Sequence, residues 1–171
     1  MLFRSDDLTS AVGDGYRGIW YMNQPTKDEY VYKYSGGYAT YPQQHVPIAI
    51  YVASQRKTFF VFGGSAGNVS VNKDELQHYV SYYDHATGTV PRPVRILQKR
   101  TEDAHDNPTL SIDDAGHLFV FSSAHGTSRP SYIWRSKQPY DITAWELVEK
   151  TNFSYTQPWY LPQSKRSLFL H

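Results

Sequence analysis

The sequence predicts an all-β protein built from antiparallel strands, and three observations support this class. Helical periodicity is almost absent, whereas short runs of β-branched and aromatic residues recur between Gly, Pro, Asn and Asp. Aromatic residues make up 16% of the 171-residue chain, with 15 Tyr and 4 Trp, a composition that suits pleated sheets. The third observation is a strand plan that occurs three times along the chain.

Ten strands are predicted after an irregular first segment, residues 1–44, which also holds some strand-like runs. Each predicted strand is an apolar or β-branched run that ends at a cluster of turn-forming residues. In chain order the strands are Ile48–Ala53, Thr58–Gly63, Leu76–Tyr83, Val94–Gln98, Thr109–Asp113, His117–Ser122, Ser131–Ser136, Trp145–Val148, Trp159–Leu161 and Ser167–Leu170.

The repeat is visible in three stretches, HVPIAIYVASQRKTFFVFGG, DNPTLSIDDAGHLFVFSSAHG and TQPWYLPQSKRSLFLH. Each has a polar residue, a proline, an apolar strand, a polar turn and a second apolar strand. The prolines Pro47, Pro108 and Pro158 lie 61 and 50 residues apart, and two further strands follow in each of the first two units. Four antiparallel strands per unit of this length is the period of a β-propeller blade.

We therefore expect one domain over 1–171, with blades over 45–100 and 101–150 and the start of a further blade over 151–171. A closed propeller has roughly four to eight blades, so we expect this chain to be an N-terminal part of a larger one. The alternative fold is a β-sandwich, which needs no further blades but leaves the repeat unexplained.

Composition excludes several classes of partner. The 17 basic and 16 acidic residues nearly cancel and form no basic runs, which argues against binding to nucleic acid or to an anionic membrane. No stretch approaches the roughly 18 apolar residues of a membrane span. The chain has no Cys, so thiolate metal sites are excluded. The first residues, MLFRSDDLTS, lack the apolar core of a secretory signal.

His105 and His125 flank the predicted hairpin of the second unit, each beside small polar residues. Strands of a blade alternate in direction, so the loop before the first strand and the loop after the second lie at the same end. If Asp113 pairs with His117 across the turn, the same register places residue 105 opposite residue 125. Opposed residues have Cβ atoms about 5 Å apart, so we expect both imidazoles at one opening.

The same rule predicts which other residues share that end. They are Gln44, His45, Asn107, the loop 63–67, Gln157 and His171. From this set we take His45, Asn107 and Gln157 as candidate substrate-binding residues, together with Trp159, whose ring suits stacking on a sugar. His117 should lie at the opposite end, and His78 and His85 flank a different strand, so we expect structural roles for these three.

Two imidazoles at one opening suggest proton-transfer chemistry. An unperturbed imidazole has a pKa of about 6.5 and exchanges a proton near neutrality. Such groups could abstract a proton next to a carboxylate and stabilise the charge that develops, which begins a β-elimination. A glycosidase usually needs two opposed carboxyl groups. Asp103 and Asp106 lie near His105, but no second carboxyl cluster obviously opposes them.

Four stretches, GDGYRGIWYMNQ, YPQQHVPIAIYV, HDNPTLSIDDAGHLFVFSSAHG and YTQPWYLP, resemble bacterial proteins of the BNR-4 repeat class. Characterised members include seven-bladed polysaccharide lyases that act on ulvan and related rhamnose- and glucuronate-containing glycans. The resemblance implies a secreted or periplasmic lyase with proton transfer by His105 and carboxylate binding or neutralisation by His125, or the reverse. It also implies a Tyr and an Arg from later blades, which would leave this chain with an incomplete site.

Two alternatives to a lyase stay open. A sialidase-type glycoside hydrolase would carry the Asp-box S-x-D-x-G-x-x-W, but SIDDAGHLF spaces Gly116 differently and lacks the Trp. YRGI resembles the sialidase Arg motif, which would make Arg17 a carboxylate clamp. The third possibility is a glycan-binding propeller without catalysis. All three readings predict an anionic polysaccharide or oligosaccharide as partner, and none requires a cofactor. A structural divalent metal is compatible with the fold, but we name no ligands for it.

Overall fold

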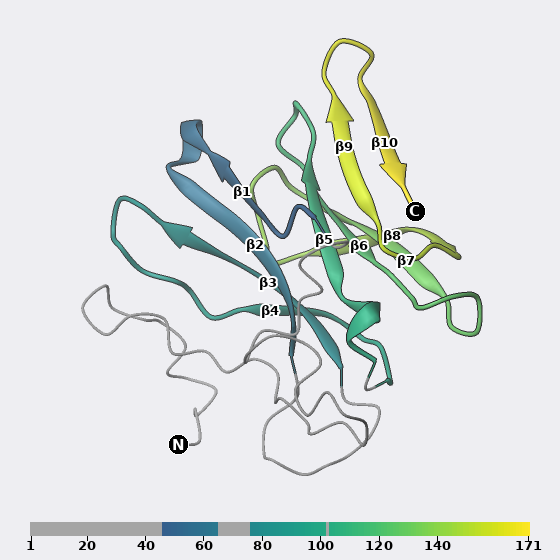
Figure 1. Ribbon diagram of the computed structural model, residues 1–171. Coiled ribbons are helices and arrows are strands. Elements are labelled where there is room, and N and C mark those ends of the chain that lie inside the picture. The colour runs from purple at the N-terminus through teal and green to yellow at the C-terminus, as the bar shows by residue number, and fades with distance from the viewer. Residues whose placement is uncertain (1–45, 65–75, 102) are drawn as a thin grey trace, which may run out of the picture.

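A computed structural model of the chain describes residues 46–64, 76–101 and 103–171. Every pair of neighbouring strands in this part of the chain is antiparallel, and the strands form two four-stranded sheets and one hairpin (Figure 1). The all-β prediction is therefore confirmed. No helix within these ranges is long and apolar enough to cross a membrane.

The strands follow one another in chain order within each sheet. The first sheet contains β1 (Ala49–Val52), β2 (Lys57–Gly64), β3 (Gln77–Asp84) and β4 (Val94–Gln98). The second contains β5 (Pro108–Ile112), β6 (Leu118–Ser122), β7 (Ser131–Ser136) and β8 (Trp145–Thr151). The hairpin contains β9 (Gln157–Leu161) and β10 (Arg166–Leu170), and two short 3-10 helices are η2 (Ala53–Gln55) and η3 (Ala104–Asp106).

This sequential strand order distinguishes the two predicted folds. A propeller blade is a four-stranded meander, whereas most β-sandwiches have Greek-key connections between two facing sheets. The strand order is β1-β2-β3-β4 in the first sheet and β5-β6-β7-β8 in the second, so both sheets are meanders. The sandwich alternative is therefore wrong, and the sheets are propeller blades.

The blades pack through their first strands. β5 contacts β1 and β2 on one side and β9 on the other. The backbone N–H of Leu110 donates to the carbonyl of Pro47 at 2.9 Å, which ties the second blade to the segment that precedes β1. The core between the sheets is apolar and nearly inaccessible to water. Its buried members are Phe59, Val61, Val80, Leu110, Leu118, Val120 and Ile142.

The strand boundaries depart from the predicted ones where local turns intervene. β1 ends at Val52 because η2 follows at once, closed by Arg56 in the left-handed region at a φ of 51°. β6 begins at Leu118, one residue late, because the N–H of His117 donates to the Asp113 side chain at 2.8 Å. Gly116 has a φ of +88° in this turn, and a Cβ there would collide with the ring of Tyr140.

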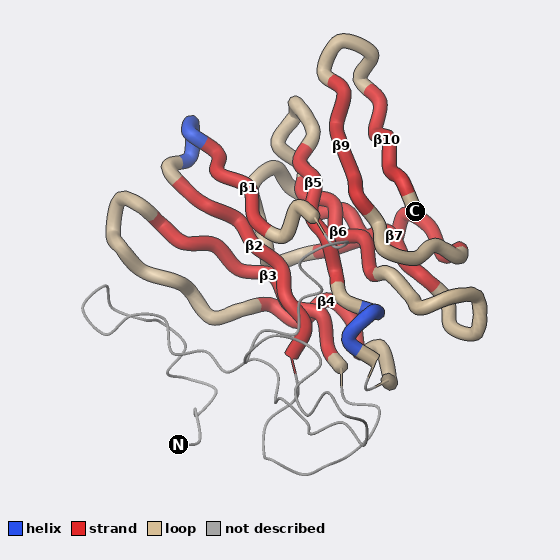
Figure 2. The backbone as a smooth tube through the Cα atoms, viewed as in Figure 1, coloured by secondary structure: helices blue, strands red, loops and turns tan. Residues whose placement is uncertain are grey.

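The hairpin tips and the candidate site lie at opposite ends of the blades. The tips that join β1 to β2, β5 to β6 and β9 to β10 all lie at one end, whereas η3 lies at the other (Figure 2). This separation follows from the alternating strand directions, because the loops that precede β5, β7 and β9 are at the end opposite to the tips.

We predict that Leu110→Ala will lower the free energy of unfolding by about 2–5 kcal/mol, since Leu110 is fully buried between the two blades. Urea denaturation followed by intrinsic fluorescence measures the change. Leu147→Ala is the matched control, because Leu147 is 48% exposed on β8 and should change the free energy of unfolding by about 0.5 kcal/mol or less. Equal losses in the two variants would contradict this assignment of the core.

Candidate functional site

His105 and His125 lie side by side at the end of the second blade. Their ring centroids are 4.2 Å apart and the rings are inclined by 25°, which is a stacked arrangement. The β5–β6 pairing has the expected register, but it ends where Pro108 faces Ser122. The histidines are therefore not partners in the strand ladder. His105 belongs to η3 and His125 to the loop after β6.

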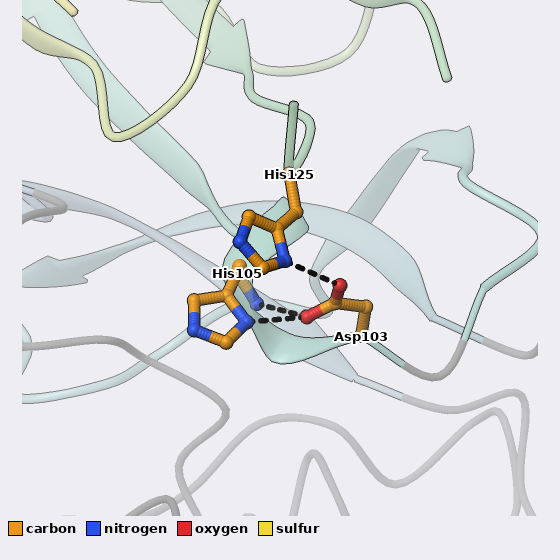
Figure 3. Close-up of side chains that lie close together, drawn as sticks. All are labelled: Asp103, His105 and His125. Carbon is orange, nitrogen blue, oxygen red and sulfur yellow. Dashed lines mark hydrogen bonds and ion pairs between the residues drawn. The ribbon is translucent and has the colours of Figure 1, made fainter. Parts of the chain in front are cut away.

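Asp103 binds both imidazoles. One of its carboxylate oxygens lies 2.5 Å from Nδ1 of His105 and also accepts the backbone N–H of His105 at 3.0 Å, which caps η3. The second oxygen lies 3.1 Å from Nδ1 of His125. Figure 3 shows the carboxylate bridging the two rings, with both Nε2 atoms directed away from it to the same side. One carboxylate thus bonds to both imidazoles at Nδ1.

The ionisation of Asp103 determines which nitrogens carry protons. Burial raises the pKa of Asp103, but hydrogen bonds from the ring and backbone of His105, its charge, and the His125 hydrogen bond together hold the pKa well below its usual range. Asp103 is therefore an acceptor-only carboxylate, and each Nδ1 donates to it. In a neutral ring with a proton on Nδ1, the Nε2 atom carries a lone pair and can act as a base.

A second carboxylate fixes the loop that carries His125. Asp106 is fully buried and accepts the backbone N–H of His125 at 2.8 Å. Arg129 donates to both Asp106 oxygens, from Nε at 2.9 Å and from a terminal nitrogen at 2.7 Å, and that terminal nitrogen also reaches Asp103 at 3.1 Å. Nζ of Lys99 lies 3.3 Å from Asp106. Two cations thus balance two carboxylates.

The pKa values of the cations reflect this pairing. Hydrogen bonding to Asp106 raises the pKa of Arg129, against an opposing effect of burial. Burial lowers the pKa of Lys99, while the charge and hydrogen bond of Asp106 act in the opposite direction. Because Lys99 also donates to the carbonyl of Pro130 at 2.8 Å, its buried ammonium group has two oxygen acceptors.

Of the four candidate substrate-binding residues, the structure describes Asn107, Gln157 and Trp159. His45 lies outside the described residues, as do Gln44 and Arg17. Asn107 is fully buried beside the histidines' segment, and neither atom of its side-chain amide has a hydrogen-bond partner in the part of the chain that the structure describes. A Cβ on Gly63 would collide with the Asn107 oxygen, so this close approach between the blades requires glycine.

Gln157 and Trp159 lie on β9 of the next unit. Gln157 begins the strand opposite Leu170, and Trp159 is 42% exposed. Within the described ranges, neither side chain forms a hydrogen bond or a ring contact with the two imidazoles. The terminal His171 instead lies near Phe153 and Phe169, with ring centroids 6.4 and 5.6 Å away.

The other three histidines, His78, His85 and His117, each lie within hydrogen-bond distance of a hydroxyl or a backbone carbonyl in another segment of the sheets. Nδ1 of His117 lies 2.9 Å from the backbone carbonyl of Ser136, and Nε2 of His85 lies 2.8 Å from the hydroxyl of Thr58. His78 is fully buried, and its Nδ1 lies 2.9 Å from the hydroxyl of Ser122, which joins β3 of one blade to β6 of the other.

The sequence prediction missed Lys99, Arg129 and Tyr155. Each precedes or follows a strand at the same end of the sheets: Lys99 follows β4, Arg129 precedes β7, and Tyr155 precedes β9. The alternating strand directions that grouped His105 with His125 would have found all three, had the rule been extended to the third and fourth strands and to the next unit.

Asp103, His105 and His125 are also the group that could ligate a metal ion among the described residues, with donor atoms all within 4.8 Å of one another. We assign no metal to them. Both Asp103 oxygens already accept hydrogen bonds from imidazole nitrogens, and one of them also accepts a hydrogen bond from the Arg129 cation. A divalent ion would have to displace these donors and lie next to a guanidinium group.

The four-stranded meander sheets and the histidine pair at their loop end define a β-propeller-type protein with a candidate proton-transfer site. The sequence of residues 66–171 matches the profile of BNR_4, a BNR repeat-containing family member. This match extends over more than half of the chain, so the chain belongs to the BNR repeat-containing family.

The chain is similar to the protein named Ulvan Lyase-PL25 of Pseudoalteromonas sp. (strain PLSV), at 30% identity over 99 residues, 46% of this chain and 20% of the relative. Two solved structures of a PL25 ulvan lyase, one of them bound to -[GlcA(1-4)Rha3S]-, are similar to it at a TM-score of 0.55 and 26% identity. Each match covers 69% of this chain and 29% of the solved chain. The chain thus spans less than a third of these relatives.

We predict that the stabilising effect of Asp103 will be lost in acid. Its pKa is lowered in the folded state, so the unfolded chain takes up the proton first, at about pH 4. Above that pH the wild type should be more stable than Asp103→Asn. The difference should shrink as the pH falls below about 4, in urea titrations at a series of pH values. A difference that stays constant with pH would contradict the lowered pKa.

Proposed function

We propose that this chain supplies the histidine site of a polysaccharide lyase, which cleaves a uronic-acid-containing glycan by β-elimination. The observation that carries the proposal is the Asp103 carboxylate, which holds two stacked imidazoles by Nδ1 and leaves both Nε2 atoms directed to one side. The similarity to an ulvan lyase supports the same reaction class. The sulfated -[GlcA(1-4)Rha3S]- unit bound by the solved relative suggests the kind of substrate.

In this reaction His105 acts as the base. Its Nε2 lone pair takes the proton from the carbon next to the uronate carboxyl group, and the electron pair of that C–H bond forms the new C=C bond. The glycosidic C–O bond at the adjacent carbon breaks, and the leaving oxygen takes up a proton from a general acid or water. Asp103 stabilises the imidazolium that results, as a carboxylate does in a catalytic Asp–His pair.

His125 binds the substrate carboxylate. Its side chain is 47% exposed, against 15% for His105, so it presents more of its ring to a ligand. When protonated on both nitrogens, it can donate from Nδ1 to Asp103 and from Nε2 to the uronate. Charge-assisted bonds of this kind stabilise the negative charge that develops on the carboxylate during proton abstraction.

Asn107 belongs to the proposed binding set because it lies at the same end of the blade as the histidines, two residues after His105. Gln157, Trp159 and His45 complete the proposed binding set, with the Trp159 ring stacking on a sugar face.

The same geometry favours elimination over hydrolysis. A retaining glycosidase needs two carboxyl groups about 5 Å apart that both reach the scissile bond. Asp106 is fully buried and held by Arg129 and Lys99, and Asp103 is held by both imidazoles. Neither carboxylate is therefore directed at a substrate.

We predict that the natural protein will release unsaturated, ultraviolet-absorbing products from ulvan or another uronate polymer, and that His105→Ala will lower kcat by about 100-fold or more. The readout is the increase in ultraviolet absorbance with time. His85→Ala is the matched control, because His85 lies at the opposite end of the blade and should leave turnover unchanged.

Three outcomes would contradict the lyase. Full turnover by His105→Ala would exclude His105 as the base. New reducing ends without ultraviolet absorbance would indicate a hydrolase. Binding of uronate oligosaccharides without any cleavage would indicate the non-catalytic, glycan-binding propeller.

A further inference from the structure

Tyr155 brings an aromatic ring from the next unit to the histidine pair. It lies in the segment between β8 and β9, and its ring centroid is 5.7 Å from that of His105 and 5.9 Å from that of His125. The ring is nearly perpendicular to His105, at 79°, and inclined by 58° to His125. One tyrosine therefore contacts both stacked imidazoles.

The backbone of Tyr155 is in a conformation that bulky residues rarely adopt. Its φ is +52°, in the left-handed region, where an L side chain other than Asn, Asp or Gly is disfavoured. A residue of this kind persists in such a conformation only when its surroundings hold it there, and such residues cluster at functional sites.

The neighbours of Tyr155 on both sides are tied to the loop that carries His125. The carbonyl of Phe153 accepts from the N–H of Ala124 at 3.1 Å, and the hydroxyl of Ser154 accepts from the N–H of Gly126 at 2.9 Å. On the other side of Tyr155, the Thr156 hydroxyl lies 2.9 Å from that of Ser123. These bonds align the segment around Tyr155 with the His125 loop, residue by residue.

Burial makes this connection rigid. Ala124, Ser123 and Thr156 are fully buried, and Phe153 is 2% exposed. The hydroxyl of Ser131 adds a bond of 2.7 Å to the Phe153 carbonyl. Because water cannot compete for these groups, the position of Tyr155 is fixed relative to His125.

We propose that Tyr155 is a positioning residue, whose ring holds the two imidazoles in their stacked orientation so that both Nε2 atoms keep facing the same side. Asp103 bonds to each ring at Nδ1, and rotation of a ring about that hydrogen bond would redirect its Nε2 atom. The Tyr155 ring, which lies against both imidazoles, restricts this rotation. The histidine site therefore includes a side chain from the third unit, and it takes its final geometry when that unit docks.

The test compares two variants with the wild type in the natural protein. Tyr155→Asn removes the ring but keeps a residue that tolerates a positive φ, and Tyr155→Phe keeps the ring without the hydroxyl. Nitrogen-15 NMR of the imidazoles reports their tautomers. We expect Tyr155→Phe to resemble the wild type, and Tyr155→Asn to shift the Nδ1 and Nε2 signals of both histidines toward averaged tautomers.

The effect on turnover rests on the proposed lyase function. There Tyr155→Asn should lower kcat by about 10- to 100-fold with little change in KM, since a misplaced base affects the chemical step more than binding. Tyr155→Phe should restore the rate. The imidazole spectra need no substrate, so they test the positioning role even if no glycan is cleaved.

Tyr160→Asn is the matched control, because the Tyr160 hydroxyl donates to Asp114 at 2.6 Å, away from the histidines. It should leave both imidazole spectra and turnover unchanged, and the urea midpoint shows that each variant is folded. Unchanged histidine signals in folded Tyr155→Asn would overturn the proposal. Equal changes in Tyr155→Phe would also overturn it, because the hydroxyl and not the ring would then be responsible.

Discussion

The ionic network around the buried carboxylate of Asp106 is the constraint on which the site depends. Asp106 is fully buried, and it joins three separate segments: Lys99 after β4, Arg129 before β7, and the backbone of His125 after β6. A buried charge is costly unless it is paired and hydrogen-bonded, and loss of one partner typically costs about 3–5 kcal/mol. This network can assemble only when both blades are in place, so it couples the fold to the position of the histidine loop.

Asp103 performs a different task with the same chemistry. Asp103 is partly exposed and contacts the two imidazoles directly, whereas Asp106 reaches His125 only through the backbone N–H of that residue. Arg129 donates hydrogen bonds to both carboxylates and thereby links the buried Asp106 to the partly exposed Asp103. The formal charges of the two carboxylates and the two cations sum to zero while both imidazoles are neutral.

The candidate site lies in the loops at one end of the blades. The sheets supply a rigid scaffold, and the loops at one end of the strands carry the candidate site. Here those loops come from three successive units: Gly63 and Lys99 from the first, the histidines and Asn107 from the second, and Tyr155 from the third. Close packing between the first two units also requires glycine at position 63, because a Cβ there would collide with the Asn107 side chain.

The sequence by itself determined the strands, their order and the end of the blade at which His105 and His125 lie. Alternating apolar residues, turn residues and the repeated prolines are local signals, and the hairpin register follows from counting residues across one turn. The same counting would also place Lys99, Arg129 and Tyr155 at this end, but it does not show which side chains contact one another there. Arg129 reaches Asp103 and Asp106 within the second unit, Lys99 reaches Asp106 only when the first blade packs against the second, and Tyr155 comes from the third unit. Tertiary structure decided these contacts, because charge pairing and ring packing depend on distances between segments that the chain order leaves open.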